Sequence, residues 1–157
     1  MRTVQGTDKD GNKIEMNIDE LFFRPAVYGI VFRDKEVLMF NQNFGYTLPG
    51  GGVDIGETLE EALVREMKEE TGYSVKIINI VEVKTNFFKL PGSNKNCQTI
   101  RMFFLCKIIS NEILEIKLEK TEIAFNSKPE WVNLDNLDKI KIGDTDEIIS
   151  IIKKSLN

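Results

Sequence analysis

Three glutamates between residues 66 and 70 have the spacing of side chains that share one side of a helix. At 3.6 residues per turn, Glu66, Glu69 and Glu70 lie within about 100° of one another. The apolar side chains on the same side are Leu59, Ala62 and Leu63. Carboxylates usually lie opposite the apolar stripe, whereas these continue it and repel one another, more strongly as water is removed. We therefore expect a cation between them, and oxygen donors without His or Cys favour Mg²⁺ or Mn²⁺.

The helix that carries these acids is predicted from its ends. Thr58 and Glu61 have the spacing of a capping box, and Gly72 stands where a helix ends on a left-handed residue. A helix is therefore predicted from about residue 58 to 71. The alternative is an acidic helix that is simply solvated, because residues 57–70 contain six glutamates.

A glycine-rich segment precedes this helix and favours a ligand site over a solvated face. In Leu48-Pro49-Gly50-Gly51-Gly52, the glycines allow backbone amides and carbonyls to approach a ligand closely. Arg65 lies one helical turn from both Glu61 and Glu69, so its guanidinium is able to fix a carboxylate in position. Loop and helix together predict a metal site.

Residues 51 to 73 resemble the Nudix box, the sequence motif of the Nudix hydrolase family. The motif positions are occupied by Gly51, Glu57, Arg65, Glu66, Met67, Glu69, Glu70, Gly72 and Tyr73. The only departure is Tyr73, where the family more often has an aliphatic residue, and it affects packing rather than chemistry. The resemblance implies an α/β fold, the Nudix-type α/β/α sandwich with a mixed β-sheet.

The resemblance also implies a metal-dependent hydrolase that cleaves a nucleoside diphosphate linked to another moiety, by attack of water on phosphorus. Bound Mg²⁺ or Mn²⁺ neutralises the diphosphate and activates the water in such a reaction. The implied metal ligands are the carbonyl of Gly51 and the carboxylates of Glu66, Glu69 and Glu70. Glu57 would either support this cluster of metal ligands or be part of it, and Arg65 would orient the carboxylates of the cluster.

The general base is less well defined by the sequence. Glu66 is the candidate within the box. Family members often carry a loop carboxylate shortly before the Trp131 segment, and Glu122 has that place, with Glu119 and Glu130 as competitors. A solvated loop acid is the ordinary interpretation of each of these three.

Candidate substrate contacts lie on both sides of the glycine loop. Phe44 and Tyr46 could stack on a base or belong to the core or its rim. Arg24 and Arg101 could meet phosphate or sugar oxygens, against ordinary surface ion pairing. Gly50 would present its backbone to the substrate.

The substrate class is only weakly encoded. Family members specific for ADP-ribose tend to carry a proline about sixteen residues past the box, where this chain has Lys89, and Pro91 is a near miss. A nucleoside triphosphate, oxidised ones included, is the leading prediction. The alternatives are an ADP-ribose or nucleotide-sugar pyrophosphatase, a non-catalytic nucleotide sensor and an acidic metal-buffering domain.

Composition excludes several other classes. The chain has 157 residues, a net charge of −4 and no histidine, so it lacks Ser-His-Asp, Cys-His and His-ligated zinc centres. It also lacks the basic surface of a duplex nucleic-acid binder. We expect free thiols at Cys97 and Cys106, no membrane contact and a cytoplasmic location, because neither a signal segment nor a long apolar run is present. A homodimer is left open.

The order of elements suits one domain over residues 1–157, with an N-terminal hairpin extension at 1–22 that turns at Asp10-Gly11. The predicted strands are 26–32, 37–40, the antiparallel pair 74–88 and 99–109, and a short strand and turn at 130–135. A last helix is predicted at 144–156, where four isoleucines have helical spacing.

Overall fold

The computed structural model describes residues 2–8, 11–42, 45–90, 93–110, 115–118, 128–142 and 145–156. The strands are β1 (Thr3–Thr7), β2 (Lys13–Asn17), β3 (Leu21–Arg33), β4 (Glu36–Gln42), β5 (Gly45–Thr47), β6 (Gly50–Gly52), β7 (Val75–Lys89), β8 (Asn96–Ile108) and β9 (Lys128–Asn133). The helices are α1 (Leu59–Thr71) and α3 (Thr145–Lys154), with short 3-10 turns η1 (Ile18–Glu20) and η2 (Leu134–Lys139).

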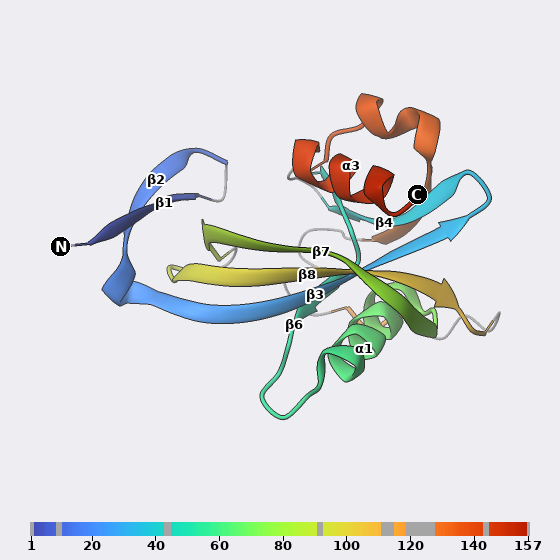
Figure 1. Ribbon diagram of the computed structural model, residues 1–157, viewed down its shortest axis with the longest axis horizontal. Helices are drawn as coiled ribbons and strands as arrows, with labels where there is room; N and C mark the ends of the chain where they lie inside the picture. The colour runs from blue at the N-terminus through green and yellow to red at the C-terminus, as the bar shows by residue number, and fades with distance from the viewer. Residues whose placement is uncertain are drawn as a thin grey trace.

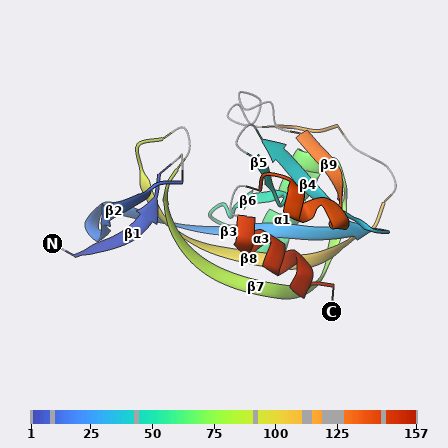
Figure 2. The same ribbon diagram turned by 90° about the horizontal axis from the view of Figure 1, so that it is seen from above.

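The strands form a mixed sheet, as predicted. Their order is β2-β1-β7-β8-β3-β4-β5, with β6 paired to β3 and β9 to β4. The long strand β3 is parallel to β8, and β8 is antiparallel to β7. The strand β4 pairs with β3 only at their hairpin, where Asp34 has a φ of 53°. Beyond this hairpin, β4 and β9 turn away from β3 and pack with α3 against one face of the sheet (Figure 2).

Two apolar clusters fill the two sides of the sheet. On one side, Ala62, Leu63 and Met67 of α1 pack with Val27 and Val31 of β3. On the other side, the buried isoleucines of α3 pack with residues of β3, β4, β8 and β9; they are Ile148, Ile149, Ile151 and Ile152. Helices therefore cover opposite faces of the sheet, which confirms the α/β/α sandwich (Figure 1).

The helix α1 has the predicted ends. Thr58 accepts a hydrogen bond from the backbone of Glu61, whose carboxylate accepts from Thr58 in return, and Gly72 ends the helix with a φ of 74°. One expected member of its apolar stripe differs, since Leu59 in the first turn remains exposed.

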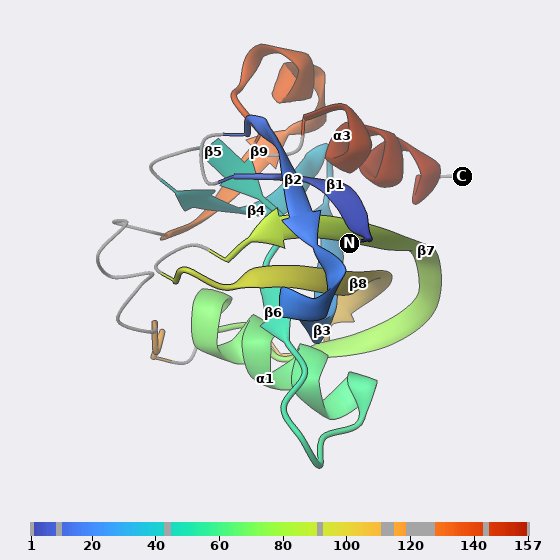
Figure 3. The ribbon, with the colours of Figure 1, turned by 90° about the vertical axis from the view of Figure 1, so that its left-hand side faces the viewer.

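The strands β1 and β2 pair as a hairpin arm that projects from the body of the protein (Figure 1) and faces the viewer in Figure 3. Met16 of β2 is buried against Gly6 of β1, and β1 meets β7 at Thr7 and Phe88. The predicted turn residue Asp10 lies outside the described residues. No described helix has the length and hydropathy that a membrane span requires.

The aromatic residues of the two long paired strands β7 and β8 differ in burial. Phe103 and Phe104 of β8 belong to the core, whereas Phe87 and Phe88 of β7 are only half-buried, because the end of β7 extends beyond both helices toward the hairpin arm. Cys97 and Cys106 are free thiols, as predicted, and both are buried within β8.

Candidate active site

The glycine loop and the acidic side of α1 face each other. The backbone N–H of Gly50 donates to Glu70 Oε2 at 2.6 Å, and the Glu70 side chain is only 4% exposed. A Cβ added to Gly51 would lie 2.6 to 2.9 Å from the carboxylate atoms of Glu66. The backbone of Gly51 therefore sits against the Glu66 carboxylate, as the resemblance implied.

The position of this loop is set by its pairing with β3. The strand β6 pairs antiparallel to β3, with Gly50 opposite Tyr28. Gly50 has a φ of 140°, and a Cβ there would lie 2.1 Å from the carbonyl oxygen of Val27. Only glycine fits at this close approach. A side chain at this position would push the loop away from β3, so the glycine is what allows the loop to pair with the sheet.

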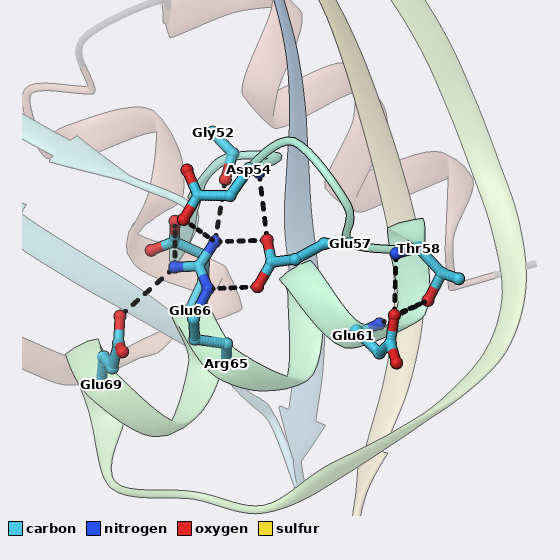
Figure 4. A network of polar contacts seen from close by, with 8 residues as sticks. All are labelled: Gly52, Asp54, Glu57, Thr58, Glu61, Arg65, Glu66 and Glu69. Carbon is cyan, nitrogen blue, oxygen red and sulfur yellow. Dashed lines mark hydrogen bonds and ion pairs between the residues drawn. The ribbon is translucent and has the colours of Figure 1, made fainter.

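Arg65 is the centre of a polar network that joins the loop to the helix (Figure 4). Its Nε and Nη2 donate to the two carboxylate oxygens of Glu57 at 2.7 and 2.8 Å. Its Nη1 donates to Glu66 at 2.9 Å and to Glu69 at 3.3 Å, and its Nη2 also donates to the carbonyl of Gly52 at 3.0 Å. One guanidinium thus orients two of the three acids on the helix.

The electrostatic effects of this network follow from the contacts. Hydrogen bonds from Arg65, and then from the backbone of Asp54, lower the pKa of Glu57 to about 2. The hydrogen bond with Glu57 raises the pKa of Arg65, so the guanidinium keeps its charge. Of the two partners expected one turn away, Arg65 holds Glu69 but not Glu61, because Glu61 closes the helix cap with Thr58.

The donor set fits a hard divalent cation. Carboxylate and backbone carbonyl oxygens are the ligands that Mg²⁺ prefers, with waters and substrate oxygens completing the shell. Among the described residues, however, no three acidic or cysteine side chains stand in the arrangement of a complete metal site. Glu69 points toward Arg65 and its side chain is 37% exposed, whereas that of Glu66 is 14% exposed. The side chains best placed for a cation are Glu66 and Glu70, beside the Gly51 backbone.

A pocket of about 550 Å³ opens beside the network. It is lined by Arg65, Lys68, Glu69, Glu115 and Lys117. The backbone N–H of Lys117 donates to the carbonyl of Glu69 at 2.8 Å, so residues 115–118 lie against α1. Lys117 is not among the site residues predicted from the sequence, since no sequence signal places that segment on the helix.

The remaining candidates from the sequence lie apart from this network where the structure describes them. Glu119, Glu122 and Phe44 lie outside the described residues. Tyr46 donates its hydroxyl to Glu130 at 2.5 Å, and Glu130 also accepts from Asn41 and Lys128. That hydrogen bond raises the pKa of Tyr46 and lowers the pKa of Glu130.

The two candidate arginines differ in their surroundings. Arg101 is buried, donates to Asn86 at 3.1 Å, pairs with Glu147 of α3 and lies over the ring of Phe103. It joins the sheet to the last helix. Arg24 instead lies beside the glycine loop, since a Cβ added to Gly52 would lie 3.1 to 3.3 Å from atoms of the Arg24 guanidinium.

Comparison with known proteins agrees with this geometry. The family model of the NUDIX domain matches residues 22–150. An ADP-ribose pyrophosphatase of Methanocaldococcus jannaschii is 34% identical over 100 residues, which cover 59% of this chain and 57% of the relative. An RNA pyrophosphohydrolase of Erythrobacter litoralis is 37% identical over 70 residues, which cover 40% of this chain and 42% of the relative. The chain thus spans about half the length of these curated relatives.

Solved structures show the same fold. A NUDIX hydrolase from Nitrosomonas europaea superposes with a TM-score of 0.66 at 18% identity, over 85% of this chain and 88% of that one. The match to the family model extends over most of the sequence and includes the glycine loop, α1 and the long strands β7 and β8. The chain therefore belongs to the NUDIX domain family.

Proposed function

We propose that the protein is a pyrophosphohydrolase that requires Mg²⁺ or Mn²⁺ and cleaves a nucleoside diphosphate linked to another moiety. One observation carries this proposal: the Gly51 backbone lies against Glu66 while Gly50 holds Glu70, so the loop and two acids of α1 converge. Membership of the NUDIX domain family and relatives named for pyrophosphate hydrolysis support it.

The residues of this chain have distinct roles in the proposal. Glu66, Glu70 and the Gly51 carbonyl would hold the cation, with Glu69 as a further ligand after it leaves Arg65. A cation there supplies charge neutralisation of the diphosphate and activation of the attacking water. Arg65 orients Glu66 and Glu69, and Glu57 fixes Arg65. Glu66 is the proposed general base within the box, with Glu122 as the candidate from outside it.

A nucleoside triphosphate, including an oxidised one, is the leading substrate of the proposal. ADP-ribose or a nucleotide sugar is the second candidate, because one relative is named an ADP-ribose pyrophosphatase. The name of another relative adds RNA as a third. A non-catalytic nucleotide sensor is disfavoured, because every acid of the box is present in this chain.

A substrate panel tests the proposal. Purified protein is incubated with nucleoside triphosphates, ADP-ribose, nucleotide sugars, dinucleotides, coenzyme A or triphosphate-ended RNA, with Mg²⁺ or with a chelator. We expect cleavage at a phosphate anhydride only when the metal is present. Binding of nucleotide without turnover of any compound would instead identify a sensor, and binding of the cation alone would identify a metal buffer.

A further inference from the structure

A polar group other than the Arg65 network also lies beside the glycine loop, and it belongs to the sheet rather than to α1. Arg24 of β3 is half-buried, and it has no hydrogen bond or ion pair with the residues that the structure describes. A partly buried guanidinium without an acceptor is costly, because the loss of water around the charge is not compensated. The Arg24 guanidinium is therefore available to bind an anion.

A buried hydroxyl next to Arg24 is also unsatisfied. Thr99 of β8 is 0% exposed, and its Oγ1 has no hydrogen-bond partner among the described residues. Arg24 and Thr99 are register partners in the parallel pair of β3 and β8, so their side chains share one face of the sheet. Tyr28 and Phe103 are also register partners, four residues further along each strand, so their stacked rings lie on the same face.

Arg24 also lies close to the place of the diphosphate in the proposed reaction. Its guanidinium contacts the Gly52 position, one residue from the Gly51 backbone that faces Glu66. Toward β8, Arg24 is the register partner of Thr99, and the charge of Arg24 opposes the rise that burial causes in the pKa of the Cys97 thiol. Because β3 pairs with β6 on one side and with β8 on the other, Arg24 stands between the glycine loop and Thr99.

We propose that Arg24 and Thr99 form a subsite for a third phosphate group, next to the two phosphates held at the box. This inference rests on the proposed function. The flexible Arg24 side chain turns toward the phosphate and uncovers the Thr99 hydroxyl, and both groups donate hydrogen bonds to phosphate oxygens. Arg101 has no part in the subsite, because Glu147 and Asn86 already hold it.

The charge of the subsite discriminates between the candidate substrates. A full positive charge that has no carboxylate partner in the described part of the chain favours an anionic ligand over the neutral hydroxyls of a sugar. ADP-ribose and nucleotide sugars place a neutral sugar beyond the diphosphate, whereas a nucleoside triphosphate places another phosphate there. The subsite therefore selects compounds with three consecutive phosphates.

Calorimetry with inorganic ligands tests the subsite without requiring turnover. Tripolyphosphate and pyrophosphate are titrated into the protein with Ca²⁺ in place of Mg²⁺. We expect the wild type to bind tripolyphosphate about tenfold more tightly than pyrophosphate, because one additional charge-assisted hydrogen bond increases the affinity by about that factor. Arg24→Gln should remove this preference, whereas Arg24→Lys should keep part of it. No preference in the wild type, or the same preference in Arg24→Gln, would overturn the proposal.

Arg33→Gln is the matched control, because Arg33 lies at the other end of β3, pairs with Glu36 and undergoes the same change of charge. It should retain the preference for tripolyphosphate. A loss of the preference in Arg33→Gln would attribute the effect to net charge and would overturn the subsite.

Thr99 is tested by a substitution that keeps its shape. Thr99→Val should weaken tripolyphosphate binding several-fold while leaving pyrophosphate binding and the melting temperature unchanged or improved, since a buried hydroxyl without a partner is removed. Thr99→Ser, which keeps the hydroxyl, should bind as the wild type does. If Thr99→Val binds both ligands as the wild type does, the hydroxyl contacts only structural water and the subsite as proposed is wrong.

Kinetics separate this inference from the proposed function. If the wild type hydrolyses nucleotides, Arg24→Gln should raise KM for nucleoside triphosphates about tenfold more than for ADP-ribose, with kcat little changed. Equal losses for both substrates would reject the subsite and leave the hydrolase intact. Tripolyphosphate selectivity without hydrolysis of any nucleotide would reject the hydrolase and keep the subsite.

Discussion

The carboxylate of Glu57 and the guanidinium of Arg65 meet through paired hydrogen bonds of 2.7 and 2.8 Å, although Glu57 lies outside the helix that carries Arg65. This contact ties the loop before α1 to the middle of the helix. It also leaves Nη1 of Arg65 free to contact Glu66 and Glu69 from one side. The acids of the site are thus oriented from the loop as well as by the helix.

The contribution of Glu57 to stability should depend on pH. Its folded-state pKa of about 2 lies below the usual value of 4.5, so folding favours the ionised form. The contribution is complete above the unfolded-state pKa and is lost as the pH falls toward about 2. We expect Glu57→Gln to melt at a lower temperature than the wild type at neutral pH. Thermal melts should show this gap closing as the solution is acidified through that interval. A gap that stays constant with pH would assign the effect to packing.

Two adjacent glycines should respond differently to alanine. In Gly50→Ala the new Cβ meets the Val27 backbone and φ is unfavourable, so we expect a loss of more than about 2 kcal/mol of folding stability. In Gly51→Ala the three atoms nearest to the new Cβ all belong to the Glu66 carboxylate, which is able to move. That variant should keep most of its stability and lose activity. Denaturant unfolding and hydrolysis rates check both, and the opposite order of effects would contradict the loop geometry.

Glu70→Gln should separate metal binding from folding. The amide oxygen of Gln is still able to accept the hydrogen bond from Gly50, and the repulsion between residues 66 and 70 is relieved. We expect hydrolysis to fall at least about 100-fold, because a charged ligand is lost, with little change in melting temperature. Glu60→Gln is the matched control, since Glu60 is an exposed glutamate of the same helix. Wild-type turnover in Glu70→Gln would exclude Glu70 from the metal site.

Tyr46 should show whether its ring or its hydroxyl matters. Tyr46→Phe loses the bond to Glu130, for a cost of about 1–2 kcal/mol of stability, and keeps the ring. If Tyr46 stacks on the base, Tyr46→Phe should retain the KM for nucleotides and Tyr46→Ala should raise it. Equal KM values in both variants at matched protein stability would assign Tyr46 to the core alone.

Local signals explain what the sequence could predict. The cap residues Thr58, Glu61 and Gly72 act within one helical turn, so they define α1 without the rest of the fold. The side of α1 that carries Glu66 and Glu70 follows from helix geometry in the same way. The turn between the predicted strands 26–32 and 37–40, where Asp34 has a positive φ, likewise depends only on residues that are neighbours in sequence.

Contacts between distant segments were beyond such reasoning. The bond of Arg65 to Glu57 depends on the path of the loop, which local spacing does not determine. The pairing of Arg24 with Thr99 depends on the register of two parallel strands that lie far apart in sequence. The same limit applies to Lys117 against Glu69, where a backbone contact leaves no pattern in the side chains.

The central claim is that the glycine loop and the acids of α1 hold a divalent cation. Binding of Mn²⁺, followed by electron paramagnetic resonance in the wild type, in the double variant Glu66→Gln with Glu70→Gln, and in Glu60→Gln, tests it most directly. The account predicts binding by the wild type and by Glu60→Gln, and none of comparable affinity by the double variant. Equal Mn²⁺ binding by all three proteins would contradict it.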